Sequence, residues 1–242
     1  MTLLAIDAGN TRIKWGVHDG AGWILRGALP TAEAARLGDA LAQPHRLERA
    51  VIANVAGERV AQALASALPA GIEPNWVVSR AEQCGVRSGY ADPAQLGADR
   101  WAALIGARHL CSGPCVVVNA GTTMTVDVLS AESIFLGGFI VPGYALMRDA
   151  LAANTAQLEL RDGAFSFFPD NTGDAIASGA LNALAGAIDR MCRYVVETGE
   201  DDPAIVLSGG DAALLEPRLN RRPQVVDNLV LEGLARIGAN DV

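Results

Sequence analysis

The first 29 residues alternate between apolar and polar positions in the way that β-strands do. LLAID (3–7) is a short apolar run, and TRIKWGV (11–17) places Ile13, Trp15 and Val17 on one face. GWILRGAL (22–29) follows a turn that contains glycine. The pattern predicts three consecutive strands at the start of the chain.

From residue 31 the apolar spacing becomes helical and then alternates between helix and strand. We expect helices over 31–42 and 57–68 and strands over 49–54 and 75–79. The segment 92–110, DPAQLGADRWAALIGARHL, is predicted as one helix opened by Asp-Pro. This alternation of strands and helices predicts an α/β fold.

The second half of the sequence begins in the same way as the first. CVVVNAGTTMTVDVL (115–129) predicts a strand, a turn of small residues and a second strand, and SIFLGGFIV (133–141) predicts a third. Helices are expected over 142–155 and 173–197, then a strand, a glycine turn and a helix in PAIVLSGGDAALL (203–215). A final helix is expected around 229–238.

Two short segments repeat the same order of residue types. In AIDAGNTRIKW (5–15) and VVNAGTTMTVD (117–127), an apolar strand leads to Asp or Asn, then Ala, Gly, a polar residue and Thr. Asp7 and Asn119 lie 112 positions apart, close to half the chain. We interpret the repeat as a duplication of two α/β halves, 1–112 and 113–242, with the boundary near the CSGP segment at 111–114.

The charge and the composition exclude several classes of protein. The net charge of −8 argues against a nucleic-acid-binding surface, which needs clustered positive charge. The sequence has no run of about 18 apolar residues, and its first residues do not resemble a signal peptide, so we expect a cytoplasmic protein that does not enter the membrane. The four cysteines form no CxxC pair and combine with no histidine in a zinc pattern, so we expect reduced thiols.

The two repeated turns have the chemistry of anion sites. Backbone N–H groups that converge at a glycine turn bind anions, and Asn10, Thr11, Thr122 and Thr123 add side-chain donors. Lys14, the only lysine, could neutralise a phosphate, and Asp7 is placed to hold Mg²⁺, which prefers oxygen ligands. The alternative is that both are ordinary hairpin turns with a turn acid.

The segment LGADRW (96–101) is a second candidate for chemistry. Asp99 could accept a proton from a substrate hydroxyl, and Arg100 could bind a substrate carboxylate with both of its terminal nitrogens. The alternative is a solvated Asp–Arg pair on the exposed face of the helix. Tyr90 either lines the same pocket or packs, and Asn171 or Thr172 could simply cap the following helix.

Five motifs in this order resemble those of the type III pantothenate kinase family and span nearly the whole chain. They are DAGNTRIK (7–14), GADR (97–100), NAGTT (119–123), GGFIVPG (137–143) and NTGDAIASG (171–179). The resemblance implies an actin-like fold of two duplicated ribonuclease-H-like halves with the active site in the cleft. It also implies ATP-dependent phosphorylation of pantothenate to 4′-phosphopantothenate, which begins coenzyme A biosynthesis.

The resemblance further implies roles for individual residues. Asp99 would be the catalytic base. Pantothenate would bind to Tyr90, Gly97, Ala98, Asp99, Arg100 and Thr172, with Thr172 supplied by the second subunit of a homodimer. ATP would bind to Asp7, Ala8, Gly9, Asn10, Thr11, Arg12, Ile13, Lys14, Gly121, Thr122 and Thr123, with Asp7 on the Mg²⁺ side.

One position departs from the family pattern. Where the family commonly has an aspartate that ligates K⁺ or NH₄⁺, this sequence has Asn119, which has no charge. This puts the monovalent cation site in question, and Lys14 is not a fixed feature of the motif. Two other functions stay open: a sugar kinase of the same superfamily, and a regulatory role in transcription, because relatives have been labelled Bvg accessory factors.

Overall fold

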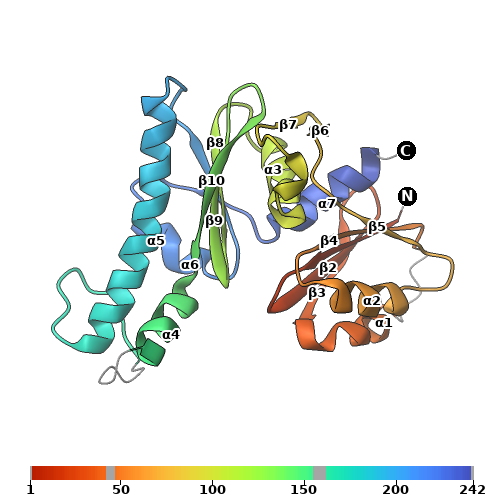
Figure 1. Ribbon diagram of the computed structural model, residues 1–242, viewed down its shortest axis with the longest axis horizontal. Coiled ribbons are helices and arrows are strands. Elements are labelled where there is room, and N and C mark those ends of the chain that lie inside the picture. Colours follow the sequence, from red (N-terminus) through yellow and green to blue (C-terminus); the bar gives the residue numbers. More distant parts are fainter. Residues whose placement is uncertain (1, 42–46, 155–161, 241–242) are drawn as a thin grey trace. The chain divides into compact units, whose positions relative to one another are not determined.

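The computed structural model describes residues 2–41, 47–154 and 162–240, which divide into two units (Figure 1). Unit 1 comprises Met1–Leu110 and Asn228–Val242, and unit 2 comprises Cys111–Asp227. The chain therefore enters unit 2 inside the predicted boundary segment. It differs from the predicted halves in that the last helix belongs to unit 1.

Unit 1 is built on a sheet of five strands in the order β3-β2-β1-β4-β5. The strands β1, β2 and β3 form an antiparallel meander, and β4 and β5 continue the sheet parallel to β1. Their bounds are β1 Leu3–Ala8, β2 Arg12–His18, β3 Trp23–Pro30, β4 Arg49–Asn54 and β5 Pro74–Trp76. A core of apolar side chains that includes Leu4, Ile6, Ile13 and Ile52 lies on one face of this sheet.

The remaining elements of unit 1 are short helices, a small hairpin and two packed helices. The bounds are η1 Thr31–Arg36, α1 Leu37–Ala40, α2 Glu58–Ala67, β6 Glu82–Gln83, β7 Val86–Ser88, η2 Pro93–Gln95, α3 Ala98–Arg108 and α7 Leu229–Asn240. The predicted helix 31–42 is thus a 3₁₀ helix followed by one α-turn, and its last predicted residue lies outside the described residues. The predicted strand 75–79 is shorter, and the β6–β7 hairpin was not predicted.

Helices α3 and α7 lie side by side because glycines let their backbones approach closely (Figure 1). A Cβ atom on Gly233 would lie 1.8 Å from the carbonyl oxygen of Ala102, and one on Gly106 would lie 2.6 Å from that of Leu229. Since α7 buries its apolar side chains in this packing and against β1 and β4, it belongs to unit 1 although it ends the sequence.

Unit 2 repeats the topology of unit 1. Within it the strands follow the order β10-β9-β8-β11-β12, with β8, β9 and β10 antiparallel and β11 and β12 parallel to β8. The bounds are β8 Cys115–Ala120, β9 Thr123–Leu129, β10 Ile134–Pro142, β11 Ala204–Ser208 and β12 Gln224–Val225. The same strand order in both units confirms the predicted α/β fold with two similar halves.

The helices of unit 2 are α4 Tyr144–Asn154, α5 Thr172–Glu197, α6 Ala212–Leu215 and the 3₁₀ helix η3 Glu216–Arg218. The long helix α5 runs along β8 and β9 (Figure 1) and buries Leu181, Leu184 and Ile188 in the core of the unit. Asn171 caps this helix, because its side-chain oxygen accepts a hydrogen bond from the backbone N–H of Asp174 at 3.0 Å. None of the helices in the described parts of the chain is long and apolar enough to span a membrane.

Candidate active site

Asp7 lies near the end of β1, where the strand leads into the first repeated turn. In the β1–β2 ladder it is paired with Lys14. The turn that follows is closed by a hydrogen bond of 3.1 Å from the N–H of Gly9 to the carbonyl oxygen of Arg12. The segment is therefore a β-hairpin, and its register places the lysine beside the acid.

Thr31, which directly follows β3, also holds this turn. Thr31 donates its backbone N–H to the carbonyl oxygen of Thr11 at 3.1 Å and its hydroxyl to the carbonyl oxygen of Gly9 at 2.7 Å. Asn10, Thr11 and Arg12 are exposed at the tip of the turn. The backbone of the turn is fixed while its side chains stay accessible to a ligand.

Ile13 stands apart from the other residues of the predicted phosphate turn. Its side chain is fully buried in the core of unit 1. Its side chain is therefore not available to a ligand.

Burial raises the pKa of the Asp7 carboxyl from its ordinary value of 3.8 to about 7. The charge of Lys14 lowers this pKa, and that of Asp99 raises it. The three ionisable groups therefore lie close enough to interact, so the geometry brings together residues from two separate motifs. A cation bound here would favour the charged form of Asp7.

The carboxylates of Asp7 and Asp99 fit Mg²⁺ better than a metal whose ligands all come from protein side chains. Within the described ranges no group of three or more His, Cys, Asp or Glu side chains is placed to hold a metal. Mg²⁺ is commonly bound through one or two carboxylates, water and substrate phosphates. Asp7, with Asp99 nearby, matches that donor set.

The GADR motif lies at the start of α3 and not within a longer helix, which corrects the prediction for 92–110. Asp92 caps the short helix η2 by accepting a hydrogen bond from the N–H of Ala94, and Leu96 and Gly97 are extended. Helix α3 then begins at Ala98. Asp99 is thus in the first turn of α3, where backbone N–H groups have no partner within the helix.

Gly97 makes room for the carboxylate of Asp99. One carboxylate oxygen, Oδ1, accepts a hydrogen bond of 2.8 Å from the N–H of Arg100. A Cβ atom on residue 97 would lie 2.6 Å from that same oxygen. Any larger residue at 97 would therefore displace the carboxylate or the chain around it.

Arg100 is buried, which decides between the two interpretations of the Asp–Arg pair. Only 7% of its surface is exposed, and its Nη1 lies 3.5 Å from the hydroxyl of Tyr90. A solvated pair on an exposed helix face is thereby excluded. A charged side chain is seldom buried without a binding or structural role. Asp99 and Arg100 are therefore the strongest candidates for substrate recognition in unit 1.

The second repeated turn, in unit 2, has the layout of the first without its charges. Asn119 is paired across the β8–β9 ladder with Thr125, as Asp7 is paired with Lys14. The N–H of Gly121 donates to the carbonyl oxygen of Thr123 at 3.1 Å, and Thr122 and Thr123 are exposed. This turn offers neutral hydrogen-bond donors to a ligand.

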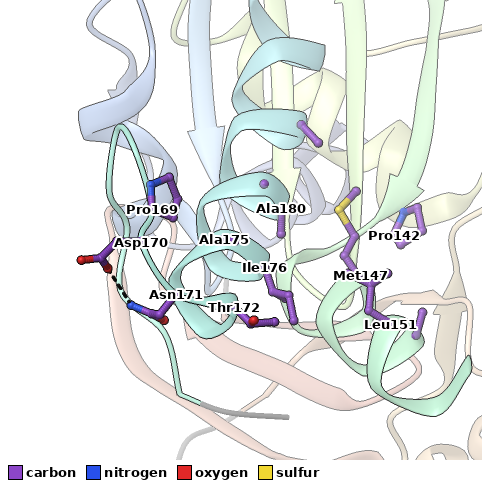
Figure 2. A pocket seen from close by; sticks show the side chains of 13 residues that line it. Pro142, Met147, Leu151, Pro169, Asp170, Asn171, Thr172, Ala175, Ile176 and Ala180 are labelled. Atoms are coloured by element: carbon purple, nitrogen blue, oxygen red, sulfur yellow. Dashed lines mark hydrogen bonds between the residues drawn. The ribbon is translucent and has the colours of Figure 1, made fainter. Parts of the chain in front are cut away.

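Thr172 lies on the rim of a cavity between α4 and α5 in unit 2 (Figure 2). The cavity has a volume of about 920 Å³ and is lined mainly by apolar side chains, among them Met147, Leu151, Ile176 and Ala180. Thr172 itself is exposed at the first turn of α5. Figure 2 shows that it lies on the same wall as Asn171, whose amide donates to Asp170 at 3.2 Å.

The predicted residues fall into two groups, and two further residues were not predicted. Asp7, Lys14, Tyr90, Asp99 and Arg100 belong to unit 1, whereas Asn119, Thr122 and Thr172 belong to unit 2. The sequence did not predict that Thr31 holds the first turn, or that the backbone N–H of Asp211 donates to the carbonyl oxygen of Ala120 beside the second turn at 3.1 Å. A signal for Asp211 was present, because it follows a Gly-Gly pair directly after a buried strand.

Comparisons with known proteins agree with these motifs. Residues 3–194 match the profile of a family described as type III pantothenate kinase. The type III pantothenate kinase of Aromatoleum aromaticum is 54% identical over 240 residues, which cover 99% of this chain and 98% of the relative.

Two solved structures are similar in fold. A conserved protein of Campylobacter jejuni, proposed to be a Baf family transcriptional activator, has a TM-score of 0.64 at 21% identity and covers 98% of both chains. A Sinorhizobium meliloti protein proposed to be a 2-dehydro-3-deoxygalactonokinase has a TM-score of 0.60 at 16% identity, covering 99% of this chain and 100% of that one. At these identities the likeness concerns the fold alone.

Proposed function

Because the chain belongs to the type III pantothenate kinase family, which phosphorylates pantothenate in coenzyme A biosynthesis, we propose that the start of α3 carries the chemistry of this reaction. The observation that carries the proposal is the arrangement of Gly97, Asp99 and the buried Arg100. This arrangement fixes a carboxylate at a helix start beside a guanidinium that is withdrawn from solvent.

Asp99 is proposed as the general base. Its Oδ1 accepts the hydrogen bond from the N–H of Arg100, and Oδ2 would be the oxygen that receives the proton. A carboxylate oxygen can accept the proton of the pantothenate hydroxyl while the hydroxyl oxygen attacks the γ-phosphorus of ATP and ADP leaves. Since phosphoryl transfer depends mainly on positioning and charge neutralisation, a carboxylate fixed by the helix start suits this role.

Arg100 and Tyr90 are proposed to bind pantothenate, with Arg100 facing its carboxylate. The planar guanidinium can make two parallel hydrogen bonds to a carboxylate. The contact of Arg100 with the Tyr90 hydroxyl supports this, because it orients the guanidinium before substrate arrives. Gly97 and Ala98 would approach the substrate through their backbone.

The two repeated turns are proposed to bind the phosphates of ATP. The support is that Thr11, Thr122 and Thr123 are exposed at the two glycine turns, whose backbones are fixed by hydrogen bonds within each turn. Asp7 would hold Mg²⁺, which when bound offsets the negative charge of the phosphates. Asn119 can offer a carbonyl oxygen to K⁺ or NH₄⁺ but no charge, so we propose that any monovalent cation binds weakly.

A homodimer is proposed on separate grounds. The resemblance to the family implies that Thr172 contacts pantothenate bound to the neighbouring subunit. In this structure Thr172 is exposed on the rim of the apolar cavity, where a second subunit could reach it. Sedimentation velocity should therefore give twice the monomer mass of 25.1 kDa. A monomer at all concentrations would contradict the proposal. We also propose a cytoplasmic location, because the reaction uses ATP.

The reaction is tested by measuring ADP release from Mg·ATP with and without pantothenate, in K⁺, NH₄⁺ and Na⁺ buffers. We expect release that depends on pantothenate, and 4′-phosphopantothenate as the product. The Asp99→Asn protein is the matched control for contaminating kinases. Turnover in none of the buffers would overturn the proposal, and turnover with a sugar in place of pantothenate would favour the other kinases of this fold.

A further inference from the structure

The two units hold their repeated turns by different means. In unit 1 the residue after β3, Thr31, gives the first turn two hydrogen bonds, one from its N–H and one from its hydroxyl. In unit 2 the residue after β10 is Gly143, whose N–H donates to the carbonyl oxygen of Thr122 at 2.9 Å. Gly143 has no side chain with which to make the second bond.

No larger residue fits at 143. A Cβ atom there would lie 1.9 Å from the carbonyl oxygen of Gly121 and 2.8 Å from that of Thr122. The second turn thus packs directly against the backbone at the start of α4. Residue 143 therefore cannot make a second hydrogen bond to the turn as the Thr31 hydroxyl does in unit 1.

Asp211 lies in another segment, shortly after β11, and contacts both the end of β8 and the start of α4. Its backbone N–H donates to the carbonyl oxygen of Ala120, the last residue of β8, at 3.1 Å. Its carboxylate accepts a hydrogen bond from the N–H of Tyr144, the first residue of α4. A free N–H at a helix start is well satisfied by such an acid.

These contacts close a ring of hydrogen bonds around the second turn. The ring runs from Ala120 and Thr122 to Gly143 and Tyr144, and returns through Asp211 to Ala120. Gly209 lets the glycine turn come this close, because a Cβ there would lie 2.1 Å from the carbonyl oxygen of Ala120. Its φ of +106° also favours glycine.

We infer that Asp211 is a positioning residue for the nucleotide: its carboxylate fixes the start of α4 and, through Gly143, the turn that presents Thr122 to the phosphates of ATP. This inference rests on the proposed role of the second turn. Burial raises the pKa of the Asp211 carboxyl, whereas the hydrogen bond from Tyr144 lowers it. The hydrogen bond therefore offsets part of the cost of burying a charge.

The test compares Asp211→Ala with Asp211→Asn. Alanine removes the acceptor, whereas asparagine keeps a carbonyl oxygen that can accept the Tyr144 N–H. For Asp211→Ala we expect about a tenfold weaker affinity for ATP, measured by calorimetry without pantothenate, and a matching rise in the KM for ATP. The KM for pantothenate should change less than twofold, and Asp211→Asn should restore most of the affinity. Glu216→Ala, an exposed acid nearby, is the control that should change nothing.

A second pair of variants tests the same bond from its donor side, should Asp211→Ala fail to fold. Tyr144→Pro removes the N–H at the first position of a helix, where proline is tolerated, and Tyr144→Ala removes the ring but keeps the N–H. We expect only the proline variant to weaken ATP binding. Equal affinity in both, or an Asp211→Asn protein as weak as Asp211→Ala, would overturn the inference. Such results in an enzyme that still phosphorylates pantothenate would leave the proposed function standing.

Discussion

Replacing Asp7 with asparagine should stabilise the protein, and by more at alkaline than at acidic pH. The pKa of this carboxyl is raised from 3.8 to about 7, chiefly because it is buried. For an acid whose pKa is raised on folding, the free energy of unfolding is not reduced at pH values below the unfolded pKa, because the carboxyl is then protonated in both states. Stability is then lost as the pH rises through the folded pKa.

The size of the effect follows from the shift. At about 1.4 kcal/mol per unit of pKa, a rise from 3.8 to about 7 makes the ionised carboxylate cost about 4 kcal/mol. Between about 1 and 2 kcal/mol of this is already lost at pH 5, so about 2–3 kcal/mol separates pH 5 from pH 8.5. Asp7→Asn does not titrate and avoids this loss.

The assay is urea unfolding followed by circular dichroism at pH 5, 6, 7 and 8.5, without nucleotide or Mg²⁺. The difference in unfolding free energy between Asp7→Asn and the parent protein should grow by about 2–3 kcal/mol across this range. Asp19→Asn is the matched control. Hydrogen bonds from the N–H groups of Gly22 and Ala21 lower the pKa of exposed Asp19, so its stabilising contribution is lost only at lower pH. Parallel profiles for Asp7→Asn and the parent would refute the reasoning.

The other predictions concern activity. Asp99→Asn should lower kcat by about 10²–10⁴-fold with an unchanged unfolding midpoint, as expected for loss of a general base; a kcat near that of the parent would remove Asp99 from this role. Gly97→Ala should also lower kcat, since its Cβ would lie 2.6 Å from the Asp99 carboxylate, and a fully active variant would mean that this carboxylate need not be fixed. Arg100→Lys should raise the KM for pantothenate about tenfold or more without a similar change for ATP. Lys14→Met should raise the KM for ATP, and an unchanged value would make Lys14 a surface residue. Asn119→Asp should increase activation by K⁺ or NH₄⁺, and equal rates in Na⁺ would contradict our assignment of this position.

The strand pattern and the repeated turns could be predicted because both are local. The predicted strand 49–54 coincides with β4, and the predicted helix 173–197 differs from α5 by one residue. Alternation along a strand and apolar spacing along a helix depend on neighbouring residues only, so a single sequence contains them. The pairing of Lys14 with Asp7 likewise follows from a short hairpin.

The features that decide the chemistry depend on contacts between distant segments. Nothing in the spacing of LGADRW showed that Arg100 is buried, because burial depends on the whole of unit 1. The break before α3 was hidden because Leu96 fits the apolar spacing of the helix that follows, although the backbone at Leu96 and Gly97 is extended. The return of α7 to unit 1 follows from close glycine packing against α3, which no local pattern predicts.

The duplicated turns differ in the way that their charges are balanced, and this difference sharpens the expectation for position 119. In unit 1 the positive charge of Lys14 offsets part of the cost of burying Asp7. In unit 2 the partner across the ladder is Thr125, which has no charge, and Asn119 is likewise partly buried. An aspartate placed at 119 would therefore lack the lysine that its counterpart has, and a bound cation would be the available source of compensation. The pair in unit 2 is neutral and needs no compensating charge, so Asn119→Asp should turn a weakly bound cation into one on which the folded turn depends.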